Sequence, residues 1–210
     1  DICVYSFHPV KIITTGEGGM ALTNDSELYE RMQKHRSHGI TSNPDDMYSR
    51  PRNEIWNYQQ ISIGHNYRMT DIQGSIGLIQ LGKLNRFIDE RSRLAKQYQE
   101  QLIDIKWIKT PKEPPEGRHG WQSFVCMLDQ EKAPKCRNDI MDELNHQGIS
   151  TRPGTHAIHM LNLYKERCGL RPEHFPIAGN CDQNSMAIPL HNQMNEGDVE
   201  YVVKAICEIK

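Results

Sequence analysis

A lysine, a serine and a cluster of glycines lie close together near the start of the sequence. The run SFHPVK, from Ser6 to Lys11, is followed by GEGG at 16–19. We expect this lysine to lie in a short loop between two buried strands. Desolvation favours the neutral amine of a lysine, which Schiff-base chemistry requires. The Ser6 hydroxyl could bind a phosphate oxygen, and the glycines allow backbone to approach a ligand closely.

These residues alone leave a simpler interpretation open. A single lysine in a glycine-rich loop is most often an ordinary surface lysine, because lysines are rarely buried. A choice between the two interpretations needs evidence from other parts of the chain.

Three blocks of sequence supply that evidence. The run SFHPVKIITTGEGGMALTND at 6–25 resembles the lysine-bearing segment of the sugar-nucleotide aminotransferases of the DegT/DnrJ/StrS type. The block GHNYRMTDIQ at 64–73 and the block IPLH at 188–191, before a final amphipathic segment, are similar to two further blocks of the same family. Three blocks in the right order, spread over nearly the whole chain, identify it as a member.

The resemblance implies a pyridoxal 5'-phosphate (PLP) enzyme of the α/β fold type I, like aspartate aminotransferase. Lys11 then forms a Schiff base with the cofactor and later carries a proton between two carbon positions. Ser6 matches the serine that binds the cofactor phosphate, and Asn66 matches an asparagine that reaches the phosphate from the neighbouring subunit, which implies a homodimer. His8 either contacts the cofactor or is a buried structural histidine. Arg68 is expected to brace the structure more than to bind substrate.

Other residues are expected near the sugar nucleotide. By resemblance, His159 and Tyr164 lie near that substrate, and Trp56, in a long loop, lines its pocket; an aromatic residue in such a loop can equally serve packing. The i, i+3 spacing of His156 and His159 also fits a metal pair, but no cysteine or carboxylate cluster completes it, so we expect no metal.

The implied reaction moves an amino group from L-glutamate to a nucleotide-linked keto-deoxy sugar for a surface polysaccharide. The SFHPVK run and the extended loop at 41–60 resemble enzymes that make 4-amino-4,6-dideoxy sugars, including the pseudaminic-acid type. Two alternatives stay open: a PLP-dependent sugar dehydratase, in which histidine replaces the lysine, and a non-catalytic binding or regulatory module on the same fold.

The start of the chain predicts further sequence upstream. An apolar run follows Asp1 at once, as if a strand were already in progress. In similar enzymes the aspartate that pairs with the pyridine nitrogen, the residue stacked on the ring and a Gly-Thr phosphate turn all precede the lysine. We therefore expect this chain by itself to lack half of its site.

The resemblance implies that 1–84 is the end of a large cofactor-binding domain and that 85–210 is a connecting helix with a small domain. The alternation of strands and helices in the second region by itself predicts an α/β or α+β small domain. Capping signals predict helices that begin after Ser26, Thr70 and Asn195. The remaining expected elements are strands at 2–7, 20–23, 124–128 and 148–151, helices at 84–102, 138–146 and 156–167, an irregular loop at 38–65 and a connector at 111–120.

The composition excludes several classes of protein. The chain has 25 Lys and Arg against 27 Asp and Glu and no basic stripe, so nucleic acid is not an expected partner. It has no apolar run near the ~20 residues of a membrane span and no signal-peptide pattern at its start. Its six cysteines are scattered without a CxxC pair, which fits free thiols in the cytoplasm.

Overall fold

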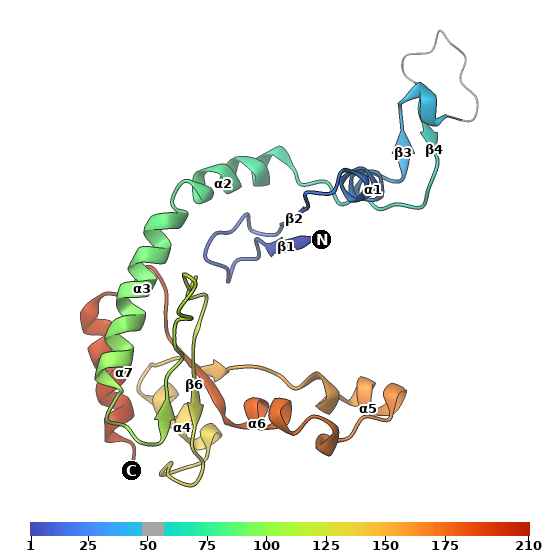
Figure 1. Cartoon of the computed structure of the whole chain (residues 1–210). Helices are drawn as coiled ribbons and strands as arrows, with labels where there is room; N and C mark the ends of the chain where they lie inside the picture. The colour runs from blue at the N-terminus through green and yellow to red at the C-terminus, as the bar shows by residue number, and fades with distance from the viewer. Residues whose placement is uncertain (48–56) are drawn as a thin grey trace. The chain divides into compact units, whose positions relative to one another are not determined.

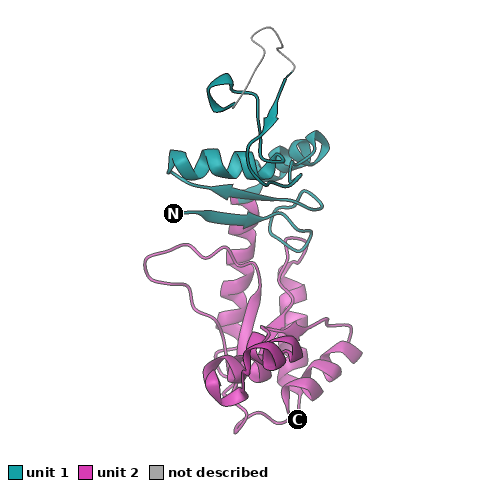
Figure 2. Cartoon of the chain, turned by 90° about the vertical axis from the view of Figure 1, so that its right-hand side faces the viewer, with its two compact units in different colours: residues 1–84 teal, residues 85–210 magenta. Residues whose placement is uncertain are grey.

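The structure, a computed structural model, describes residues 1–47 and 57–210. The chain divides into two compact units, Asp1–Leu84 and Asn85–Lys210 (Figure 2). No helix of the described residues is long and apolar enough to cross a membrane. The assignment of the first unit to a larger cofactor-binding domain stays a prediction.

The first unit is built from two short antiparallel sheets and two helices (Figure 1). Its elements are β1 (Cys3–Ser6), β2 (Gly19–Leu22), α1 (Ser26–Arg36), β3 (Ile40–Thr41), the 3-10 turn Pro44–Asp46, β4 (Gln59–Gln60) and α2 (Asp71–Leu81). Strand β1 pairs with β2, and β3 pairs with β4. The segment 38–65, which was expected to be an irregular loop, therefore contains a short pair of antiparallel strands.

Local capping interactions set where the two helices of this unit begin. The carboxylate of Asp25 accepts hydrogen bonds from the N–H groups of Glu27 and Leu28, so Asp25 is the N-cap and not Ser26 as predicted. The predicted capping box of Thr70 and Gln73 is confirmed at the start of α2. Each cap satisfies N–H groups that have no partner within the helix.

The prediction that the first two strands are buried is wrong within the described residues. All residues of β1 and β2 are exposed, Val4 to 76%. Helix α2 is apolar but has no buried residue, and Ile72 is also 76% exposed. The apolar sequence of these elements is that of segments buried on both faces, but none of the described elements covers them.

The second unit contains a four-stranded antiparallel sheet in the order β5-β6-β8-β7. Its strands are β5 (Ile108–Lys109), β6 (Phe124–Leu128), β7 (Arg152–Pro153) and β8 (Ser185–Ile188). Its helices are α3 (Leu84–Gln101), α4 (Arg137–His146), α5 (Asn162–Cys168), α6 (Pro176–Asn184), α7 (Glu196–Glu208) and the 3-10 turns Ile158–Met160 and Pro172–His174. The strand predicted at 148–151 is wrong: those residues precede β7. The helix predicted at 156–167 is a 3-10 turn followed by α5.

A continuous hydrophobic core holds the second unit together. Alternate residues of β6 are buried, which places Phe124, Cys126 and Leu128 on one face of the sheet. Helices α3, α4 and α7 add their apolar faces to the same cluster, including Leu94, Ile140, Leu144, Val199 and Ile206. At ~25 cal/mol per Å² of apolar surface removed from water, this core is the main source of stability of the unit.

A buried arginine joins three segments of this unit. Arg91 on α3 is 6% exposed, and its Nη1 donates to the carbonyl oxygens of Trp121 and Leu190, each at 2.9 Å. Its Nε donates to Asn192 Oδ1 at 2.8 Å. Burial lowers the pKa of this guanidinium. Its partners are carbonyl and amide oxygens from the segment before β6 and the segment after β8, and the nearby residues Phe124 and Ile188 are paired in the sheet. Arg91 therefore acts as a clamp between α3 and the two loops at one end of the sheet.

Replacing Arg91 with methionine should destabilise the protein strongly. The change keeps much of the side-chain volume but leaves buried carbonyl groups without donors, so we expect the free energy of unfolding to fall by roughly 3 kcal/mol. Arg93→Met is the matched control, because Arg93 pairs with Glu196 on the surface, and surface pairs contribute less than about 1 kcal/mol. Urea denaturation of both variants measures the difference; equal losses would exclude the clamp.

The cysteines should differ sharply in reactivity. Cys126 lies in the core, and burial raises the pKa of its thiol to about 12. The thiolate is the reactive form, so native Cys126 should resist alkylation at mildly alkaline pH. The exposed Cys3, Cys136, Cys168 and Cys207 should react. Peptide mass spectrometry after brief iodoacetamide treatment measures this; rapid labelling of Cys126 without denaturant would contradict the packing.

Candidate active site

The loop that carries Lys11 is closed at its base by backbone hydrogen bonds. The N–H of Phe7 donates to the carbonyl of Gly18 at 2.9 Å, and the N–H of Thr15 donates to the carbonyl of Phe7 at 3.1 Å. The Thr14 hydroxyl donates to that same carbonyl at 2.8 Å. The loop joins β1 to β2, and these bonds give it a defined shape.

The side chains of Lys11 and Ser6 are available for a ligand. Lys11 is half-buried, and its backbone N–H donates to the carbonyl of His8 at 2.9 Å. Its amine has no hydrogen bond or ion pair with any residue that the structure describes. Ser6 Oγ accepts a bond from the N–H of His8 at 3.3 Å, which leaves the hydroxyl proton to donate elsewhere. An amine and a hydroxyl donor fit an aldehyde and a phosphate, which are two of the groups by which a protein holds PLP.

His8 is not the buried histidine that was one of its two expected roles. Its ring is exposed, and Nδ1 accepts from the N–H of Val10 at 3.3 Å. Its Nε2 lies 3.8 Å from a carboxylate oxygen of Glu17. The ring therefore stabilises the turn before Lys11 and presents one edge to the outside of the loop.

Asn66 is held against the C-terminal end of α1. It forms an isolated antiparallel bridge with Ser37. On one side of it, the N–H of His65 donates to the carbonyl of His35 at 2.7 Å; on the other, the N–H of Tyr67 donates to the carbonyl of Arg36 at 2.9 Å. The side chain of Asn66 is exposed and forms no hydrogen bond within the described part of the chain. A rigid backbone thus presents a free amide.

Two glycines allow this close approach of backbone to backbone. Gly39 has a φ of 69°, and a Cβ there would lie 1.9 Å from the carbonyl oxygen of Ser62. A Cβ on Gly64 would lie 2.3 Å from the nitrogen of Gly39. The His65 ring stacks on the Tyr67 ring with a centroid separation of 4.6 Å, and the His35 ring meets the His65 ring edge to face at 4.8 Å. We call this arrangement of Gly39 and Gly64 the glycine contact.

The expected role of Arg68 has no support in the structure. Its side chain is exposed and forms no hydrogen bond or ion pair over residues 1–47 and 57–210. A bracing residue would need such a partner.

The expected substrate residues belong mostly to the second unit. His159 is 5% exposed, its ring lies 5.1 Å from that of Phe175, and its Nε2 is buried without a hydrogen-bond partner. Tyr164, on α5, is 40% exposed. Trp56 lies outside the described residues.

The metal alternative for the two histidines is not favoured. His156 is exposed, and its Nδ1 lies 3.6 Å from a carboxylate oxygen of Asp182, whereas His159 is buried beside Phe175. Among the described residues, no group of three or more His, Cys, Asp or Glu side chains could hold a metal ion.

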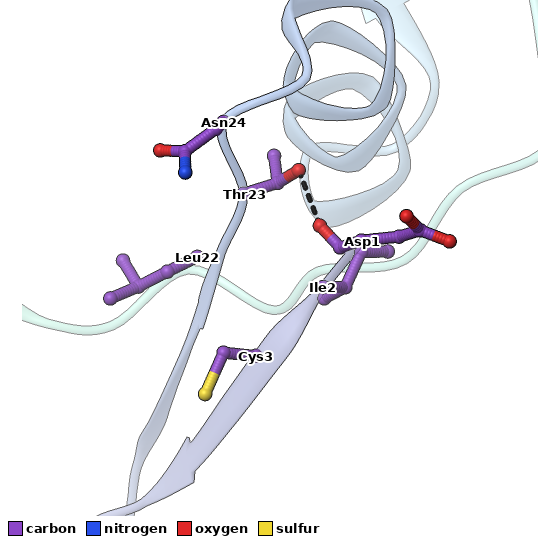
Figure 3. A pocket seen from close by; sticks show the side chains of 6 residues that line it. All are labelled: Asp1, Ile2, Cys3, Leu22, Thr23 and Asn24. Atoms are coloured by element: carbon purple, nitrogen blue, oxygen red, sulfur yellow. Dashed lines mark hydrogen bonds between the residues drawn. The ribbon is translucent and has the colours of Figure 1, made fainter.

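A hollow at the far end of the β1–β2 ribbon is separate from these residues. Its lining consists of Asp1, Ile2, Cys3, Leu22, Thr23 and Asn24 (Figure 3). The Thr23 hydroxyl donates to the carbonyl of Asp1 at 2.7 Å across it. Because Cys3 pairs with Leu22 at this end and Ser6 pairs with Gly19 at the other, the hollow is not part of the lysine loop.

Comparison with known proteins identifies the family. The family described as DegT/DnrJ/EryC1/StrS aminotransferase matches residues 1–207. The chain belongs to this family. The predicted family and the fold-type-I architecture are thereby confirmed.

Relatives of this aminotransferase-family chain come from several bacteria. The spore coat polysaccharide biosynthesis protein SpsC of Bacillus subtilis is 31% identical over the whole chain, which covers 54% of SpsC. GDP-perosamine synthase of Caulobacter vibrioides is also 31% identical, with 52% of its length covered. The crystal structure of Helicobacter pylori PseC, an aminotransferase of pseudaminic acid biosynthesis, matches 99% of the chain with a TM-score of 0.87, at 26% identity and 53% coverage of PseC. The chain thus spans about half the length of these relatives.

Proposed function

We propose that the protein is a PLP-dependent aminotransferase that moves an amino group from L-glutamate to a nucleotide-linked keto-deoxy sugar. The observation that carries this proposal is the closed loop after Ser6, which presents the half-buried amine of Lys11 without a partner among the described residues. Membership of an aminotransferase family supports it.

Four residues of the first unit have a part in this proposal. Lys11 Nζ would hold the cofactor through its aldehyde, and as a free amine it would carry a proton between two carbon atoms. Ser6 would hold the cofactor phosphate through its hydroxyl proton, and Asn66 of the partner subunit would hold the same phosphate through its side-chain amide. His8 bounds the turn before Lys11. PLP, when bound, supplies the electron sink that lets the amino group move.

We propose a homodimer with shared sites, because Asn66 serves the partner's cofactor in this scheme. The exposed apolar faces of β1, β2 and α2 are consistent with further polypeptide against this unit. The scattered free cysteines support a location in the cytoplasm.

The sugar substrate is inferred from relatives and from the second unit. SpsC is named for spore coat polysaccharide, GDP-perosamine synthase for a GDP-linked sugar, and PseC for pseudaminic acid. We propose a nucleotide-linked 4-keto-6-deoxy sugar as acceptor. His159, with its unpaired buried Nε2, Tyr164 and Trp56 are the proposed sugar-nucleotide contacts. The presence of lysine at position 11 argues against a sugar dehydratase.

A two-stage assay tests the proposed function. The protein with added PLP is first mixed with L-glutamate, and 2-oxoglutarate is measured; a panel of keto-sugar nucleotides is then added, and the amino sugar is detected by mass spectrometry. Stoichiometric 2-oxoglutarate in the first stage and amino sugar in the second support the proposal. Binding of sugar nucleotides without any 2-oxoglutarate would instead favour a non-catalytic binding module.

A further inference from the structure

Gln73 connects the start of α2 to the loop that carries Lys11. Its Oε1 accepts from the backbone N–H and the hydroxyl of Thr70, each at 3.0 Å, which completes the capping box. Its Nε2 donates to the carbonyl oxygen of Glu17 at 2.8 Å, 56 residues away in sequence. The two ends of one amide therefore have different tasks.

The orientation of this amide is fixed by its partners. A backbone N–H can only donate, so the atom facing Thr70 must be the oxygen of Gln73. A carbonyl oxygen can only accept, so the atom facing Glu17 must be the nitrogen. No other side chain of similar length does both: glutamate lacks the donor, and lysine lacks the acceptor.

A second contact shows that α2 lies directly against the loop. Gly77 stands four residues after Gln73, so both lie on the same face of the helix. A Cβ on Gly77 would lie 3.0 Å from the methyl carbon of Thr15. Thr15 is 3% exposed, and its hydroxyl donates to the carbonyl of Glu17 at 2.7 Å, so that this one carbonyl accepts from both Thr15 and Gln73.

The fixed carbonyl lies at the base of the lysine loop. Glu17 immediately precedes Gly18, whose carbonyl accepts from Phe7 and closes the loop. Phe7 in turn follows Ser6. A shift of the Glu17 carbonyl would therefore displace Phe7, inside the Ser6–Lys11 run, and Thr15, after it. Small displacements of reacting groups matter for reactivity.

We propose that Gln73 is a positioning residue for the cofactor lysine: it links the helix cap of α2 to the Glu17 carbonyl and so holds the Lys11 amine and the Ser6 hydroxyl in register. This inference rests on the proposed function, because it concerns the same site. It gives the last residue of the GHNYRMTDIQ block a physical role beyond capping.

Gln73→Glu separates the two tasks of the side chain. A glutamate oxygen can still accept from Thr70, so the cap is kept, but the donor to Glu17 is lost. We expect kcat of transamination and the rate of borohydride trapping at Lys11 to fall roughly tenfold, the effect of one lost hydrogen bond, with KM for the sugar nucleotide nearly unchanged. Gln73→Asn keeps the amide but is one methylene too short, and should show the same loss.

Thr70→Ala is the matched control, because it removes the cap hydroxyl and leaves the bond from Gln73 to Glu17. This variant should lower Tm by roughly 2–4 °C and keep the parent trapping rate. If both Gln73 variants are trapped by borohydride at the parent rate, the positioning role is overturned. If Gln73→Glu fails to fold, the trapping rate of Gln73→Asn alone tests the positioning role. Absence of trapping at Lys11 in the parent itself would instead overturn the proposed function, a different and distinguishable result.

Discussion

Replacing Lys11 with alanine is expected to lower kcat of transamination by at least about a thousandfold, since one group is both covalent anchor and proton carrier. Lys11→Arg should be equally inactive, because arginine keeps the positive charge but is never a neutral amine at ordinary pH. Steady-state kinetics with L-glutamate and a keto-sugar nucleotide measures the loss.

Lys83→Ala is the control for this first prediction. Lys83 is exposed, lies two residues after the end of α2, and forms no hydrogen bond or ion pair through its side chain in the described ranges. Its loss should leave kcat within about twofold of the parent, since isolated surface substitutions are nearly neutral. Substantial activity in Lys11→Ala would require another nucleophile. That result would contradict the assignment of Lys11 as the cofactor lysine.

Replacing Gly64 with alanine should damage both stability and cofactor binding. The added Cβ would lie 2.3 Å from the nitrogen of Gly39 and 2.6 Å from the carbonyl carbon of His38. Both are backbone atoms that cannot rotate away, so the glycine contact must open. We expect the free energy of unfolding to fall by roughly 2–4 kcal/mol. Asn66, two residues on, should move, and the Kd for PLP should rise at least about tenfold.

Gly74→Ala provides the comparison for Gly64→Ala. A Cβ on Gly74 meets no atom within 4 Å, and alanine is favoured over glycine in a helix by about 1 kcal/mol. This variant should therefore be as stable as the parent or more so. Urea denaturation and equilibrium dialysis with PLP measure both effects. If Gly64→Ala binds PLP with parent affinity, the glycine contact does not position Asn66.

Those parts of the fold that depend on nearby residues could be predicted from sequence. The Thr70–Gln73 and Asn195–Asp198 capping boxes act across three residues, and the strand at Phe124–Leu128 has a two-residue alternation. Helix α3 follows from its long 3.6-residue period. In each case the pattern that specifies the element lies within the element itself.

Features that depend on distant residues could not be predicted. The burial of Arg91 requires carbonyl groups about 30 and 100 residues away, and a lone arginine in a charged helix gives no sign of this. The apolar Ile149 indicates a strand at 148–151, but this residue is buried in the segment before β7. The exposure of β1 and β2 depends on what covers them, which composition does not reveal.

In the candidate site, too, some residues could be predicted from the sequence and others could not. The resemblance of sequence blocks indicated Ser6, Lys11 and Asn66. In the described residues the side chains of Lys11 and Asn66 form no hydrogen bond, and Ser6 accepts one bond but keeps its hydroxyl proton available. Neither the donor role of Gln73 nor the glycine contact was predicted, although the capping-box spacing and the lone glycines at 39 and 64 were visible signals. The spacing of Thr70 and Gln73 predicts the helix cap, but only the structure shows that Gln73 also donates to the carbonyl of Glu17.

Borohydride trapping tests the central claim most directly. The protein with PLP is reduced, digested and analysed by peptide mass spectrometry. We expect the peptide that contains Lys11 to carry the added mass of a reduced pyridoxyl phosphate group, with no comparable modification of any other lysine. Stable attachment of the cofactor elsewhere, or a full complement of bound PLP with Lys11 unmodified, would contradict it.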